Sequence, residues 1–161
     1  MFNTILGPLD GSKLSEVSLD YIKEIATGFH TPNVILLTVA EPLYITGYGG
    51  TTSRAEIEKE TAEWEARKKE NLEKAQDYLK RAAEKLEESG VKVKTEIIEL
   101  KTNQGVASVI LDYAEKNKID LIVMSTHGRS GISRWAMGSV TDRIVRYAKC
   151  PVLSIAPKGF R

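Results

Sequence analysis

Apolar residues gather in five short runs that are rich in β-branched and aliphatic side chains, and each run predicts a β-strand. Helical patterns lie between these runs. In the first helical pattern, apolar residues recur every three or four positions, which predicts a helix with one buried face made of Leu14, Val17, Tyr21, Ile25 and Phe29. The predicted strands are residues 2–7, 33–39, 92–98, 120–124 and 151–156, and the later helices span about 54–89, 106–114 and 140–147.

The alternation of strands and helices predicts one parallel sheet covered by helices on both faces. The run at 92–98 alternates polar and apolar residues, whereas the runs at 33–39 and 120–124 are almost continuously apolar. The first therefore belongs at a sheet edge and the other two inside. With right-handed crossovers, the simplest strand order is 3-2-1-4-5, a doubly wound, Rossmann-like α/β fold. Such a sheet binds ligands beyond the carboxyl ends of its first and fourth strands, which points to the loops after residues 7 and 124.

The long helical stretch carries a second apolar stripe on a strongly charged background. Its members fall at alternating steps of three and four and are Leu72, Ala75, Leu79, Ala82 and Leu86. Coiled coils show such a stripe, but this one persists for barely two heptads and contains small alanines. We therefore expect a helix packed on the sheet with a solvated charged face. No linker, repeat or low-complexity tract divides the chain, which predicts one domain over residues 1–161.

Composition narrows the range of functions. Of the 161 residues 42% are hydrophobic, enough to bury the core of one ordinary domain. The net charge of +1 lacks the positive excess of a nucleic-acid-binding protein. A single cysteine, Cys150, excludes an internal disulfide, and with two histidines it is a poor inventory for zinc. No segment approaches the roughly 18 to 20 apolar residues that span a bilayer, and no basic leader is present, so we expect a cytoplasmic protein without a membrane partner.

The loop after the fourth predicted strand reads MSTHGRSGISRWAMGSVT over residues 124–141 and leads directly into the last helix. Ser139 is a natural N-cap for that helix, whose first N–H groups would then point toward the ligand. Gly138 removes a side chain that would keep a phosphate away from them, and Gly128 allows a close backbone approach on the other side. These features predict a phosphate site at the start of the last helix.

Polar side chains of the same loop fit this hypothesis. The hydroxyls of Ser139 and Thr141 are possible donors, and Arg129 and Arg134 add positive charge. The alternative is a surface loop with ordinary turn chemistry. The coincidence of two glycines, a helix start and the predicted end of the fourth strand favours a phosphate or nucleotide site.

The loop after the first strand, GPLDGS, supplies the other half of the predicted site. Pro8 leaves the sheet, Asp10 places a carboxylate at the end of the strand, and Gly11 turns the chain into a helix that Ser12 is expected to cap. A carboxylate there suits a ribose hydroxyl or a phosphate-bound divalent metal. The alternative is that Asp10 only bonds the backbone of its own turn.

With these motifs, the sequence resembles the universal stress protein family, and in particular its ATP-binding subgroup. The family signature is Gly-x-x-Gly, nine residues, then Gly-Ser or Gly-Thr. This chain has Ser125-Thr126-His127-Gly128, nine residues, then Gly138-Ser139. The resemblance also covers ILGPLDGS, VILLTV, DLIVMSTHGRSG and CPVLSIAP, nearly the whole chain. It implies the fold of the adenine nucleotide alpha hydrolase-like proteins. Ser125 departs from the signature, because a glycine is expected at this position. The β-carbon of Ser125 would narrow the ribose side of the predicted nucleotide site.

Carried over position by position, the resemblance implies three groups of ligand contacts. One flanks adenine and ribose, one lies along the ribose, and one holds the phosphates. These groups are Pro8, Asp10 and the backbone of Val39; Met124 and Ser125; and His127, Gly128, Arg129, Gly138, Ser139, Val140 and Thr141. The expected ligand is ATP, with Mg²⁺ or Mn²⁺ on its phosphates, and no protein ligand to the metal is assigned.

The resemblance implies a nucleotide-dependent regulatory or stress-response protein with an unidentified downstream partner. One alternative is a weak ATPase or nucleotidyl-transfer enzyme on the same scaffold. His127 and Asp10 are the only side chains that we can name for such chemistry. Because no partner carboxylate or nucleophile is evident beside His127, we assign no catalytic residue. The other alternative is a dimeric interaction module that does not bind nucleotide, to which the Ser125 departure lends some support.

The last predicted strand, residues 151–156, is apolar and has an open outer edge in the predicted order. Such an edge pairs readily with another chain, and a two-fold contact between identical edges forms a closed dimer. We therefore expect a homodimer through this edge, and the family resemblance implies the same.

Overall fold

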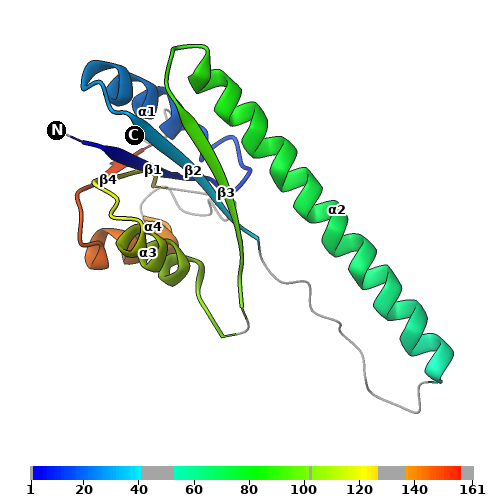
Figure 1. Ribbon diagram of the computed structural model, residues 1–161. Coiled ribbons are helices and arrows are strands. Elements are labelled where there is room, and N and C mark those ends of the chain that lie inside the picture. The colour runs from blue at the N-terminus through cyan, green and yellow to red at the C-terminus, as the bar shows by residue number, and fades with distance from the viewer. Residues whose placement is uncertain (1, 41–52, 102, 127–136, 157–161) are drawn as a thin grey trace.

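The computed structural model describes residues 2–40, 53–101, 103–126 and 137–156, and within these ranges it contains one five-stranded sheet (Figure 1). The strands are β1 (Thr4–Pro8), β2 (Asn33–Ala40), β3 (Val93–Glu99), β4 (Leu121–Ser125) and β5 (Val152–Ile155). Their order is β3-β2-β1-β4-β5 and every neighbouring pair is parallel, which confirms the predicted order. The helices are α1 (Val17–Gly28), α2 (Arg54–Glu87), α3 (Val106–Lys116) and α4 (Ser139–Tyr147).

Two apolar cores lie on opposite faces of the sheet. One forms between the sheet and helices α1 and α2, with Ile5, Ile22 and Leu79 among its buried members. The other forms between the sheet and helices α3 and α4, and includes Leu6 and Ile144. The alternation of side chains along a strand sends consecutive residues of β1 to different cores. The helices therefore cover both faces, as the sequence predicted (Figure 1).

The buried face of α1 differs from the prediction. Tyr21 and Phe29, two of the expected core residues, are 42% and 53% exposed, whereas Ile22 is fully buried. The buried residues of α1 are instead Ser18, Leu19, Ile22 and Ala26, a stripe shifted by about one position from the expected one. The tip of the Ile22 side chain fills the space over Gly7, where a β-carbon would lie 2.6 Å from Cδ1 of Ile22.

The long helix α2 packs on the sheet only through its C-terminal half, so the predicted packing is confirmed there. Leu79, Ala82 and Leu86 of the expected stripe are buried, together with Ala83. Toward the N-terminus, Lys68 reaches the end of β3 and pairs with Glu99 at 2.6 Å. Residues 54–60 are all exposed, and this half of the helix extends past the sheet (Figure 1).

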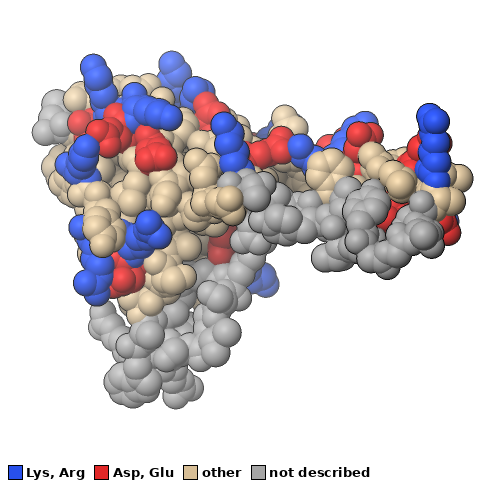
Figure 2. All heavy atoms as spheres, turned by 90° about the horizontal axis from the view of Figure 1, so that it is seen from below, with Lys and Arg blue, Asp and Glu red and all other residues tan. Residues whose placement is uncertain are grey.

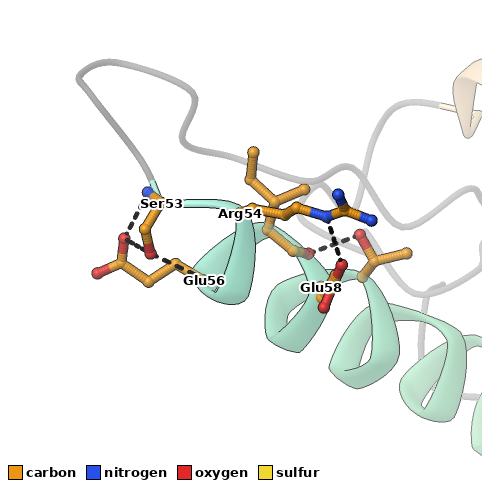
Figure 3. A network of polar contacts seen from close by, with 6 residues as sticks. Ser53, Arg54, Glu56 and Glu58 are labelled. Carbon is orange, nitrogen blue, oxygen red and sulfur yellow. Dashed lines mark hydrogen bonds and ion pairs between the residues drawn. The ribbon is translucent and has the colours of Figure 1, made fainter.

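The exposed start of α2 is stabilised by local polar contacts. Ser53 Oγ accepts from the Glu56 N–H at 3.3 Å, and the Glu56 carboxylate accepts from the Ser53 N–H at 2.8 Å, which completes a capping box (Figure 3). The side-chain hydrogen bond from Ser53, followed by the backbone one, lowers the pKa of Glu56. Arg54 and Glu58 form an ion pair at 3.0 Å one turn apart. Positive and negative side chains are interspersed along this helix and over the described face of the body (Figure 2).

The close packing of α1 on β1 can be tested at Gly7. We expect Gly7→Ala to destabilise the fold by about 1–3 kcal/mol, because the new methyl group displaces Ile22 and Leu36 in a packed core. Ile22→Val, which removes Cδ1, costs about 0.5–1.5 kcal/mol alone. The double variant should then be more stable than the sum of the two single changes predicts. Urea unfolding measures all three.

The matched control is Gly28→Ala, whose β-carbon has nothing within 4 Å. This variant should unfold at the wild-type urea concentration or somewhat above it, because alanine favours a helix over glycine. Strict additivity of Gly7→Ala and Ile22→Val would contradict the proposed contact between the two positions.

Candidate functional site

The two central strands separate at their carboxyl ends. β1 pairs with β4 at Ile5–Leu121 and Leu6–Ile122. On its other side, β1 stays paired with β2 as far as Pro8, and β4 stays paired with β5 as far as Ser125. The last residues of β1 and β4 therefore end beside each other without a shared ladder. This is the position at which open α/β sheets bind ligands, and it lies where the sequence predicted a site.

The loop after β1 is a tight turn built on Asp10. Oδ1 of Asp10 accepts from the N–H and the hydroxyl of Ser12, at 2.9 and 2.6 Å. The Ser15 hydroxyl donates to the carbonyl of Ser12 at 2.8 Å, and its oxygen lies 3.4 Å from the donating N–H of Asp10. Asp10 therefore does bond its own turn, as the alternative interpretation proposed. The same bonds fix the carboxylate at the end of β1, so the turn role and a ligand role are compatible.

The expected helix start after this turn lies further along the chain. The Ser12 hydroxyl accepts from the Ser15 N–H at 3.1 Å and so caps a short turn, while α1 itself begins at Val17. The prediction that Ser12 caps α1 directly was therefore wrong by one turn. The extra turn places Ser15 behind Asp10, where its hydroxyl joins the hydrogen bonds of the loop.

The end of β2 holds the same loop from the other side. The Thr38 hydroxyl is buried and donates to the carbonyl of Leu9 at 3.0 Å, and the Leu9 N–H donates to the carbonyl of Leu37 at 2.8 Å. Pro8 is buried and Val39 is half-buried. The bonds bring Pro8, Asp10 and Val39 to one end of the sheet, as the proposed adenine and ribose contacts require.

The N-terminus of α4 is hydrogen-bonded to the end of β4. Thr141 is buried, and its hydroxyl donates to the carbonyl of Ser125 at 3.0 Å. The N–H of Gly138 donates to the carbonyl of Thr126 at 2.9 Å. What Thr141 offers a ligand is thus its backbone N–H, since its hydroxyl already has a carbonyl partner. These contacts bring Met124, Ser125 and residues 138–141 together.

The N-cap of α4 is Gly138, and the prediction that Ser139 caps this helix was wrong. Gly138 has φ −58° and ψ 145°, and its carbonyl accepts from the N–H of Asp142 at 2.9 Å, so Ser139 is already the first helical residue. No side-chain cap is made in the described part of this helix. Without a capping side chain, the N–H groups of Ser139, Val140 and Thr141 lie at the positive end of the helix dipole, an arrangement that binds anions.

Ser125 occupies the position where the family signature has a glycine. It is the last residue of β4, pairs with Ile155, and is buried. Extended strand backbone suits any residue, so the fold itself does not require glycine there. His127, Gly128, Arg129 and Arg134, the remaining predicted contacts, lie outside the described residues.

Sequence reasoning missed two side chains that shape this end of the sheet, Thr38 and Ser15. A polar residue within the apolar run of β2 was a usable signal for Thr38, because a buried hydroxyl needs a partner. The described ranges contain no group of three His, Cys, Asp or Glu side chains suited to a metal. They also contain no helix with the length and apolar character needed to cross a membrane.

Comparison with known proteins gives a consistent result. The model of the universal stress protein family matches residues 1–155. Universal stress protein MJ0531 of Methanocaldococcus jannaschii is 34% identical over 156 residues, which cover 96% of this chain and 82% of that protein. The solved structure of MJ0577 is 28% identical with a TM-score of 0.74 and 99% coverage of both chains. UspA from Lactobacillus plantarum is 26% identical with a TM-score of 0.73, covering 96% of this chain and 97% of that one.

More distant structures share the fold and were solved with nucleotides. One, from Arabidopsis thaliana with AMP bound, is 18% identical with a TM-score of 0.63 and covers 98% of this chain and 93% of that one. Another, from Archaeoglobus fulgidus in complex with dAMP, is 18% identical with a TM-score of 0.57 and covers 96% and 98%. At this identity they show the common fold. With the family match over almost its full length, this chain belongs to the universal stress protein family.

Proposed function

We propose that this chain binds ATP at the carboxyl ends of β1 and β4 and acts as a nucleotide-dependent regulatory protein in a stress response. The observation that carries the proposal is the N-terminus of α4, which receives no side-chain cap from the described residues and is hydrogen-bonded to the end of β4 beside the turn of Asp10. A helix N-terminus binds phosphate through its N–H groups and its dipole. Neighbours of the same fold hold AMP and dAMP, which supports an adenine nucleotide as the ligand.

The parts of the site match the parts of a nucleotide. Pro8 and Val39 offer apolar surface and backbone to the adenine, and the carboxylate of Asp10 suits ribose hydroxyls. The backbone N–H groups of Ser139, Val140 and Thr141 suit the phosphates. In this arrangement the base lies toward β2 and the phosphates toward α4.

A divalent cation completes the proposal. A triphosphate carries more negative charge than a helix N-terminus and the two arginines, Arg129 and Arg134, can balance. Mg²⁺ or Mn²⁺ bridging its oxygens supplies the remaining positive charge. Among the described members of the site, Asp10 is the one titratable side chain. Because catalysis of hydrolysis would need a positioned acid or base, the site suits nucleotide binding better than nucleotide hydrolysis.

Binding is tested first by denaturing the purified protein and assaying the released adenine nucleotide, then by titrating the nucleotide-free protein with ATP and Mg²⁺. At about 100 times its Kd, ATP should stabilise the fold by about 2.7 kcal/mol and raise Tm by roughly 5–10 °C. If no nucleotide is released and ATP does not raise Tm, the proposal is excluded.

The position of the phosphates is tested with Gly138→Val. The φ and ψ of Gly138 suit any residue, so the fold should survive while the added isopropyl group obstructs phosphate approach. We expect ATP affinity to fall at least about tenfold, a loss of about 1.4 kcal/mol of binding free energy. Calorimetry measures the affinity and circular dichroism the fold.

The matched control is Gly105→Val, since Gly105 is the N-cap of α3, has an extended backbone with nearly the same ψ, and has open space around its β-carbon. This control should bind ATP like the wild type. Equal ATP affinities for Gly138→Val and the wild type would place the phosphates elsewhere.

The cation is tested by comparing ATP with AMP in Mg²⁺ and in EDTA. We expect ATP affinity to fall about tenfold or more on chelation, because the triphosphate needs the cation to balance its charge. AMP has a single phosphate and should change by less than about twofold. The same response for both nucleotides would argue against a cation bridging the phosphates.

We also propose that two copies assemble through β5. Within the described sheet, β5 pairs with β4 on one side and is an edge on the other. Its Leu153 is 37% exposed, and the neighbouring α4 exposes Val145 and Tyr147 at 45% and 66%. Exposed apolar residues beside an open strand edge favour pairing with an identical edge.

Leu153→Glu tests this assembly, because two copies would place like charges at the pairing edge. We expect the variant to sediment as a monomer at concentrations at which the wild type is a dimer. Ile57→Glu is the control: Ile57 is equally exposed, at 37%, but lies at the projecting start of α2. A monomeric wild type, or dissociation by both variants alike, would contradict pairing through β5.

A further inference from the structure

The projecting half of α2 continues the face by which this helix packs on the sheet. Leu79, Ala82 and Leu86 make that packing, and residues 54–60 are exposed beyond the sheet (Figure 1). Steps of three and four residues carry the same face toward the start of the helix. We call its continuation the α2 stripe, which consists of Ile57, Thr61, Trp64, Lys68 and Leu72.

Trp64 is the largest side chain of the α2 stripe. It is half-buried, and the Lys68 ammonium lies 5.7 Å from the centre of its ring, a cation–π distance. Lys68 also pairs with Glu99 at 2.6 Å, so its aliphatic stem contributes to the apolar surface of the stripe. Ile57, two turns before Trp64, is 37% exposed. Since tryptophan is enriched among the residues that dominate binding energy at protein interfaces, the stripe has the composition of a contact surface.

The charges of this half of α2 change sign along the helix. Residues 54–65 contain five glutamates and two basic residues, a net charge of −3, whereas residues 67–69 are Arg-Lys-Lys. Two such helices in antiparallel orientation place the acidic start of each beside the basic segment of the other, while parallel helices place like charges together. The ion pair between Arg67 and Glu63 within the helix is long, at 3.8 Å. The charge pattern therefore suits an antiparallel second copy of the same helix.

A two-fold axis between residues 63 and 64 matches the charges on both sides of the α2 stripe. Residues equally far from this axis lie side by side, so Glu60 meets Arg67 of the second copy and Glu58 meets Lys69. The helical repeat places Glu60 and Arg67 along one side of the stripe and Glu58 and Lys69 along the other. The symmetry forms each pair twice.

The same axis also fits the apolar side chains. Trp64 lies next to Trp64 of the second copy, and Ile57 packs between its Lys68 stem and its Leu72. Residues 54–73 overlap over about 28 Å, and the two bodies lie at opposite ends of the helix pair. Such an overlap buries less than the roughly 800 Å² per partner of a standard interface, so the contact is weak and forms at high protein concentration.

We propose that the projecting half of α2 pairs antiparallel, through the α2 stripe, with the same segment of a second copy. This inference goes beyond the proposed function and does not depend on nucleotide binding. It uses a different surface from β5, so the two contacts together join dimers into larger assemblies.

Sedimentation in a Leu153→Glu background tests the pairing with the β5 contact disabled. We expect dimers that depend on concentration and are well populated by about 1 mM, the weak end of specific association. Trp64→Ala should raise the Kd at least about tenfold, because it removes the largest side chain of the contact. Circular dichroism checks that α2 stays helical. A protein that remains monomeric up to about 1 mM overturns the proposal.

The orientation is tested by exchanging charges in the same background. Glu60→Arg and Arg67→Glu each place like charges side by side and should raise the Kd at least about fivefold. The double variant restores opposite charges and should return the Kd to within about twofold of its starting value. In a parallel pair these positions lie about 10 Å apart along the axis, so the double variant would not recover. Absence of recovery overturns the antiparallel arrangement.

The control for the charge exchange is Lys59→Glu, because Lys59 lies on the side of α2 that faces away from the stripe. It should leave the Kd within about twofold of its starting value. A cover from the same chain, such as residues 41–52, gives a different result: Trp64→Ala then lowers Tm and leaves a monomer in every case. That outcome overturns pairing with a second copy.

Discussion

β1 is the strand on which the arrangement of the molecule depends. It lies in the middle of the sheet, pairs with β2 from Thr4 to Pro8, and pairs with β4 only over its first part. Full pairing with one neighbour and partial pairing with the other separates the carboxyl ends of β1 and β4. Ile22 of helix α1 packs over this strand at Gly7, which has no side chain there. The position of the candidate site is therefore set by the unequal pairing of β1 with its two neighbours.

Two buried threonines hold the ends of the central strands in the same way. Thr38 of β2 donates to the Leu9 carbonyl just beyond β1, and Thr141 of α4 donates to the Ser125 carbonyl at the end of β4. In both cases a hydroxyl from a neighbouring element satisfies a carbonyl at the point where sheet pairing stops. Hydroxyl-to-carbonyl bonds fix these positions without introducing charge. Among the described residues, the electrostatic field at the site then comes chiefly from the Asp10 carboxylate, the α4 dipole and Asp142 in the first turn of α4.

The sequence predicted the strand order, and with it the switch point between β1 and β4, because both depend on features visible along the chain. Continuous apolar runs mark inner strands, and strand order places the switch point. The buried face of α1 was not predicted, since counting apolar spacing favours Tyr21 and Phe29 and takes no account of Gly7, whose missing side chain leaves room for Ile22. The prediction of the N-cap of α4 was wrong for a related reason. An N-cap is defined by the carbonyl that accepts the first helical bond, and residue preference alone favoured Ser139 over Gly138.

The continuity of α2 gives the proposed regulatory function a physical route. Its C-terminal half packs on the sheet, and its Lys85 pairs with Glu16 just before α1, while residues 54–60 are exposed beyond the sheet. An α-helix rises about 1.5 Å per residue, so Arg54 lies about 46 Å from Lys85 along the axis. A stiff helix converts a small rotation at one end into a larger displacement at the other. Since the projecting half carries charges of both signs (Figure 2), such a displacement changes the surface offered to a partner without changing the sheet.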